Sequence, residues 1–130
     1  MIPAVGEAGA DRVRRETRMP VGPDRVWAAL TTGSDLSTWF GGDVEIEARM
    51  GGQVTVRWPD GTERHATVEE VVPPFRLSFR WAPFERTSEG RARLVRASRV
   101  EFELRPSDGG TVVAVVEEAL GSTTPAGAAR

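Results

Sequence analysis

The chain has 130 residues, of which 39% are hydrophobic and 28% charged, and its formal net charge is −2. These values fit one globular domain, and the slight negative charge gives no overall attraction to nucleic acid or to an anionic membrane. The absence of cysteine excludes disulfides, thiolate metal sites and a cysteine nucleophile, and no apolar run is long enough to span a membrane.

The N-terminal part predicts a tail, a strand and a helix. Residues 1–12 lack the charged-then-apolar order of a signal peptide, so we expect a flexible tail and a cytoplasmic protein. Residues 13–19 alternate between apolar and charged side chains, which predicts a first strand that is at most half-buried. Gly22 and Pro23 then suit the start of a helix whose apolar face carries Val26, Trp27 and Leu30.

A second, short helix is predicted in the stretch "SDLSTWF", with Ser34 as its N-cap. Leu36, Trp39 and Phe40 stand at positions i, i+3 and i+4 and therefore form one apolar stripe. Gly41 follows where a left-handed C-cap is expected. So short a helix is held by packing against the rest of the domain.

From Val44 onward the pattern is typical of about six antiparallel strands. "PDG" at residues 59–61 indicates a hairpin, and pairing Trp58 with Thr62 would place Val56 opposite Arg64. The alternation in "FRLSFRW" sets four apolar side chains on one face: Phe75, Leu77, Phe79 and Trp81. We expect residues 82–97 to form a long, mobile connection between strands.

The predicted fold class is therefore α+β, with a domain over residues 13–120 and two helices after the first strand. Residues 121–130 are expected to be a linker or the start of a C-terminal helix, because Thr124 and Pro125 suit an N-cap and a first helical position.

Three stretches together resemble the START-related helix-grip superfamily, and within it the branch named after the activator of heat-shock-protein ATPase. They are "VGPDRVWAALTTGSDLSTWF", "MGGQVTVRWPDGTERHATVEEVVPPFRLSFRW" and "SRVEFELRPSDGGTVVAVVEEAL". The resemblance implies a curved antiparallel sheet that grips a long C-terminal helix, with an apolar cavity between them. Only the apparent start of that helix is present, so we expect a trimmed chain, an open cavity, or a cover from another chain.

The main functional hypothesis is a non-enzymatic domain that binds an apolar or amphipathic small molecule in that cavity. Aromatic walls suit such a ligand, although the same side chains could simply fill the core. The residues predicted to line the site are Trp39, Phe40, Val56, Trp58, Phe79, Trp81 and Phe102.

The alternatives are a co-chaperone-like or stress-response interaction domain, and a cyclase- or hydrolase-type enzyme. For the first, Arg86, Arg91 and Arg93 in the predicted connection could bind an acidic partner. For the second, support is weak, because the single histidine, His65, is expected on the polar face and the glutamate pairs on exposed strand positions. We expect no cofactor, no metal and no nucleic-acid partner, and a monomer or homodimer.

Overall fold

The computed structural model describes residues 12–120, apart from the side chains of residues 34 and 35. Strand β1 (Arg12–Met19) leads into two helices, and seven strands follow them. The helices are α1 (Pro23–Thr31) and α2 (Ser34–Phe40), and the later strands are β2 (Asp43–Ile46), β3 (Gln53–Arg57), β4 (Glu63–Val72), β5 (Arg76–Arg86), β6 (Ala92–Leu94), β7 (Ser98–Ser107) and β8 (Gly110–Ala119).

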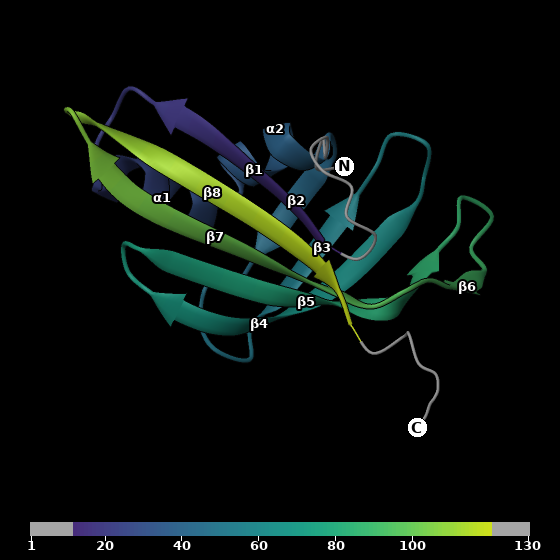
Figure 1. Ribbon diagram of the computed structural model, residues 1–130. Helices are drawn as coiled ribbons and strands as arrows, with labels where there is room; N and C mark the ends of the chain where they lie inside the picture. The colour runs from purple at the N-terminus through teal and green to yellow at the C-terminus, as the bar shows by residue number, and fades with distance from the viewer. Residues whose placement is uncertain (1–11, 121–130) are drawn as a thin grey trace.

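Neighbouring strands are antiparallel throughout one curled sheet in the order β1-β8-β7-β5-β4-β3-β2, and β6 pairs with the end of β5. Both helices lie on the same side of this half-barrel, α1 against β7 and β8 and α2 beside β2 (Figure 1). This is the expected α+β, helix-grip architecture.

The core lies between the concave face of the sheet and the helices. Each helix buries one apolar stripe, with Val26 and Leu30 in α1 and Leu36 and Phe40 in α2. Phe79 of β5 sits in the middle of the aromatic side chains, and its ring centroid lies 6.2 Å from Phe40, 5.5 Å from Trp81 and 6.1 Å from Phe102. Tilted and edge-on ring pairs of this kind add to the apolar burial that holds α2 on the sheet.

The ends of α2 confirm one prediction and correct another. Gly41 is the predicted left-handed C-cap, with φ +73°. The N-cap, however, is Gly33 and not Ser34. Gly33 adopts φ +90°, and its carbonyl oxygen accepts hydrogen bonds from both the backbone nitrogen of Ser37 (2.9 Å) and its Oγ (2.7 Å), so the first helical turn begins at residue 34.

The prediction of a long mobile connection over residues 82–97 was wrong. β5 continues to Arg86, the backbone nitrogen of Thr87 donates to the carbonyl oxygen of Arg91 (2.8 Å), and β6 returns along β5, which brings the strands after the helices to seven. The sequence gives no alternation signal here because all three residues of β6 are exposed.

The predicted β3–β4 hairpin register is confirmed. The backbone nitrogen of Trp58 donates to the carbonyl oxygen of Thr62 (2.9 Å), and Val56 pairs with Arg64. Phe75 is a correction, because it precedes β5 and its side chain is 47% exposed. Arg12, the last residue of the predicted tail over residues 1–12, is instead the first residue of β1. The rest of that tail and the predicted helix start at Thr124 and Pro125 lie outside the described residues.

Candidate functional site

A pocket of about 500 Å³ opens between the end of α2, the β3–β4 hairpin, the β5–β6 hairpin and β8. One part of its wall is aromatic and the other carries charged side chains. It is lined by Phe40, Gly41, Trp58, Asp60, Thr62, Arg64, Trp81, Glu85, Arg93 and Glu117.

The aromatic wall is fixed by one hydrogen bond and one ring contact. The indole Nε1 of Trp58 donates to the carbonyl oxygen of Phe40 (2.8 Å), which ties the hairpin to the last residue of α2. The rings of Phe40 and Trp81 meet edge to face, with centroids 5.6 Å apart. Because Trp81 is buried and Trp58 only half-buried, the wall runs from the core to the pocket mouth.

Arg64 is the most unusual side chain of the pocket. It pairs with Val56 on one side and Glu85 on the other, so it lies on the apolar concave face, with its Cζ 4.5 Å from the centre of the Trp81 ring. Its Nε and Nη2 are buried and have no hydrogen-bond partner within residues 12–120. Burial lowers the pKa of Arg64, and the negative charges of Glu85 and Glu117 oppose that shift. The guanidinium stays protonated at neutral pH.

The three carboxylates of the pocket already have partners, and Oδ1 of Asp60 accepts a hydrogen bond from the backbone nitrogen of Thr62 (2.8 Å). Glu85, which is 8% exposed, forms an ion pair with Arg93 across β5 and β6. Oε2 of Glu117 accepts a hydrogen bond from the Oγ of Ser98 (2.8 Å). With Asp60, Glu85 and Glu117 against Arg64 and Arg93, the lining of the pocket has a formal net charge of −1.

The structure separates the predicted ligand-binding residues into two groups. Phe40, Trp58 and Trp81 line the pocket. The other four pack in or against the core: Trp39, Val56, Phe79 and Phe102. Val56, Phe79 and Phe102 have no exposed area, and the ring of Trp39 lies 5.5 Å from that of Phe102.

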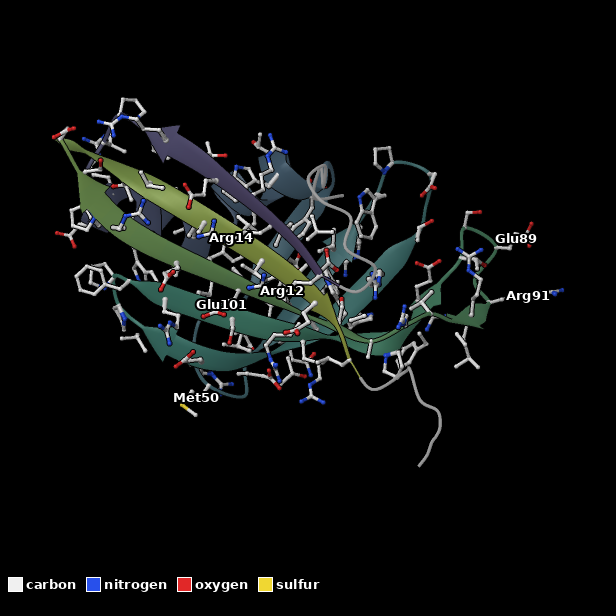
Figure 2. All side chains as sticks on the ribbon, viewed as in Figure 1. Arg12, Arg14, Met50, Glu89, Arg91 and Glu101 are labelled. Carbon is white, nitrogen blue, oxygen red and sulfur yellow. The ribbon has the colours of Figure 1, made fainter. Side chains whose placement is uncertain are left out.

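The arginines predicted to bind a partner have different surroundings. Arg93 turns to the pocket and pairs with Glu85. The Nη1 of Arg86 donates to the carbonyl oxygen of Gly90 (3.2 Å) within the hairpin turn. Arg91 points away from the molecule at the tip of that hairpin (Figure 2).

Sequence reasoning missed the charged part of the pocket, although a signal was present. The predicted hairpin register pairs Arg64 with Val56, and this pairing places Arg64 on the concave face. Glu85 continues the inward parity of Phe79 and Trp81, and Glu117 pairs with the buried Val100. A charged residue at an inward strand position is the pattern that would have identified the site.

His65 lies on the other face of the sheet, as predicted. Its Nδ1 is 3.3 Å from the Oγ1 of Thr55, and its Nε2 is 3.3 Å from the Oε2 of Glu63. Over the described part of the chain, no three histidine or carboxylate side chains gather as they would around a metal ion.

The same convex face carries an ion-pair cluster on three neighbouring strands. Oε2 and Oε1 of Glu69 accept hydrogen bonds from the Nε atoms of Arg80 and Arg99, each 2.9 Å long. The bond from Arg99 is the main reason that the pKa of the Glu69 carboxyl is lowered, and the same bond raises the pKa of Arg99. Arg14 and Glu101 lie on this face as well (Figure 2).

We expect Glu69→Gln to lower the free energy of unfolding at pH 7 by about 1 kcal/mol or less, because both arginines are partly exposed. The pKa of the Glu69 carboxyl is lower in the folded than in the unfolded protein. Its ion pairs therefore stabilise the fold fully above the unfolded pKa of about 4.3, and this stabilisation is lost as the pH falls below that value. Urea unfolding of the unmodified protein and of Glu69→Gln between pH 7 and pH 3 measures whether the difference between their free energies of unfolding disappears as the pH falls. Glu89→Gln at the exposed hairpin turn is the control, and a Glu69→Gln effect that stays constant with pH would contradict the prediction.

Comparison with protein families gives one match over most of the chain. Residues 20–129 match the model described as Activator of Hsp90 ATPase homolog 1-like protein. No curated protein is significantly similar to the chain.

Solved structures of low sequence identity share the fold. Mll3558 from Rhizobium loti is 24% identical with a TM-score of 0.66, over 83% of this chain and 77% of that one. DynU16, from the dynemicin biosynthetic locus, is 26% identical with a TM-score of 0.68, over 85% of this chain and 38% of DynU16. The chain thus spans well under half of DynU16. The Aha1 dimer from Colwellia psychrerythraea is 19% identical with a TM-score of 0.62, over 88% of this chain and 80% of that one.

Neither α1 nor α2 is long enough to cross a bilayer, and the part of the chain described here contains no other helix. The match to the family model covers both helices and all strands after them. On this evidence the chain belongs to the family of Activator of Hsp90 ATPase homolog 1-like proteins.

Proposed function

We propose that the domain binds a small amphipathic molecule in the pocket between α2, the two hairpins and β8, and that it does so without catalysing a reaction. The observation that carries the proposal is the pocket itself, whose volume of about 500 Å³ suits a small ligand and whose wall joins aromatic rings to buried charge. The rings of Trp58 and Trp81 would hold the apolar body of the ligand. The charged side chains would orient its polar end.

Two further observations support a ligand rather than a substrate. His65 lies on the opposite face of the sheet from the pocket. Glu85 forms an ion pair with Arg93 and Glu117 accepts a hydrogen bond from Ser98, so both carboxylates have a structural role in the wall of the pocket. DynU16, which has this fold, is a protein of a biosynthetic locus, and this favours a small molecule over a protein partner.

A protein-interaction role is the second candidate, and an exposed apolar pair favours it. Phe84 of β5 and Leu94 of β6 stand opposite each other, 43% and 86% exposed. Large apolar side chains exposed side by side are typical of contact surfaces. A homodimer would be one form of such a contact, and the related Colwellia psychrerythraea structure is a dimer.

Replacing Trp58 with alanine is expected to weaken binding of the uncharged fluorescent probe N-phenyl-1-naphthylamine about tenfold, a loss of about 1.4 kcal/mol. The indole forms the mouth of the pocket, and its hydrogen bond to Phe40 holds that wall in place. Probe fluorescence titrated against each protein gives the affinity.

Trp27→Ala is the matched control, because Trp27 is a half-buried tryptophan of α1 that packs on the core and does not line the pocket. Its probe affinity should equal that of the unmodified protein. If the unmodified protein is folded and does not bind the probe, or if both variants lose affinity equally, binding in this pocket is refuted and the interaction role gains support.

A further inference from the structure

The geometry of Arg64 points to the polar end of the ligand: we infer that the pocket selects a molecule with a carboxylate next to a flat apolar body. The carboxylate would bind to the Nε and Nη2 edge of Arg64, which is enclosed in the free protein and would turn toward the pocket as the ligand enters. The inference rests on the proposed function and specifies the chemistry of the ligand.

The argument starts from the two unpartnered donors. Nε–H and the neighbouring Nη2–H of a guanidinium point the same way along one edge, and their spacing matches the two oxygens of a carboxylate. In Arg64 these are the two nitrogens that are buried and make no hydrogen bond within residues 12–120. A buried donor left unpaired is unfavourable, so an acceptor that reaches this edge gains more than it would at an exposed arginine.

The surroundings of Arg64 explain why the protein itself does not use this edge. Glu85 pairs with Arg64 in the strand register but forms its ion pair with Arg93. Glu117 accepts its hydrogen bond from Ser98. The negative charges of Glu85 and Glu117 favour the charged form of Arg64 and oppose the effect of burial on its pKa, but neither carboxylate accepts a hydrogen bond from its Nε or Nη2.

The aromatic side chains set the shape of the rest of the ligand. The Trp81 ring lies 4.5 Å from Cζ of Arg64, so a group bound to the guanidinium is next to the aromatic wall. Phe40 and Trp58 continue that wall toward the mouth. A fused aromatic acid therefore matches the order of cation and rings in the pocket.

Charge limits how strongly the anion is preferred. The negative charges of Asp60, Glu85 and Glu117 oppose a further carboxylate, while Arg64 and Arg93 favour it, so the lining has a formal net charge of −1. We therefore expect the bidentate hydrogen bonds, and not a net positive field, to provide the selectivity. A preference of about tenfold over the matching neutral amide is the expected size.

The experiment measures displacement of N-phenyl-1-naphthylamine by 2-naphthoate and by 2-naphthamide, which differ in the polar group alone. The unmodified protein should bind 2-naphthoate about tenfold more tightly, and Arg64→Met should bind the two equally. Arg64→Lys should retain part of the preference for 2-naphthoate, because lysine supplies the positive charge without the two parallel N–H donors of the guanidinium. Arg91→Met, which removes the same charge at the hairpin tip, should keep the full preference.

Thermal unfolding provides a second readout. Arg64→Met should be at least as stable as the unmodified protein, because it removes two buried donors that lack partners. The inference is overturned if the amide binds as tightly as the acid, if neither displaces the probe, or if Arg64→Met keeps the preference. Absence of probe binding itself refutes the proposed function instead, so the two failures are distinguishable.

Discussion

Phe79→Ala is expected to lower the free energy of unfolding by about 3–5 kcal/mol, among the largest effects of a single truncation in this domain. Phe79 has no exposed area, and its ring contacts aromatic rings from three elements: α2, β5 itself and β7. Removal of the ring leaves a cavity that those neighbours cannot fill without moving α2 off the sheet. Urea unfolding followed by tryptophan fluorescence measures the loss.

Phe84→Ala on the same strand is the matched control. Phe84 is 43% exposed, so its truncation should cost less than about 1 kcal/mol. If the two variants lose similar stability, the aromatic cluster does not form the main support of α2.

Gly52→Ala is expected to destabilise the domain by about 3 kcal/mol, although it adds a single methyl group. A Cβ at this position would lie 2.9 Å from the carbonyl oxygen of Arg49 and in direct collision with that of Glu47. The backbone cannot yield easily, because the nitrogen of Gly52 donates to Arg49 (2.8 Å) and its oxygen accepts from Val68 (2.8 Å). Thermal and urea unfolding of the purified variant give the change.

Gly22→Ala is the control for glycine replacement. Gly22, the N-cap of α1, has φ −71°, and an added Cβ meets nothing within 4 Å. Alanine is a poorer cap but lowers the entropy of the unfolded chain, so the net effect should be a few tenths of a kcal/mol. Equal stability of Gly52→Ala and the unmodified protein would show that the turn before β3 can shift without cost.

Most of the fold follows from local patterns in the sequence. Alternation marks the strands, and the stripe of Leu36 and Phe40 together with the C-cap at Gly41 marks α2. The turn chemistry of residues 59–61 fixes the register that places Val56 opposite Arg64. β6 could not be predicted in this way, because a short edge strand whose residues are all exposed buries nothing and so has no apolar period.

The site is less accessible to sequence reasoning than the fold. The alternation of apolar residues identifies which side chains lie on the concave face. It does not show which of them are fully buried, as Phe79 is, and which remain half-buried at the pocket mouth, as Trp58 does. That difference depends on how far α2 extends over the sheet. The polar wall depends on pairings across distant strands, such as Ser98 with Glu117, which no local pattern contains.

The pairing of β1 with β8 has a consequence for how the chain acquires its structure. Arg12 pairs with Glu118, so the first and last described strands form one ladder and the sheet cannot be completed until residues 12–118 are all available. Contacts that join the two ends of a chain slow folding, because a large loop must close before they form. During synthesis, β8 leaves the ribosome last among the described strands, and until then β1 and β7 each lack a neighbour on the side that β8 will occupy. Until β8 pairs with them, these two unpaired strand edges can form incorrect strand pairings, so this is the period in which the nascent domain is most prone to misfold.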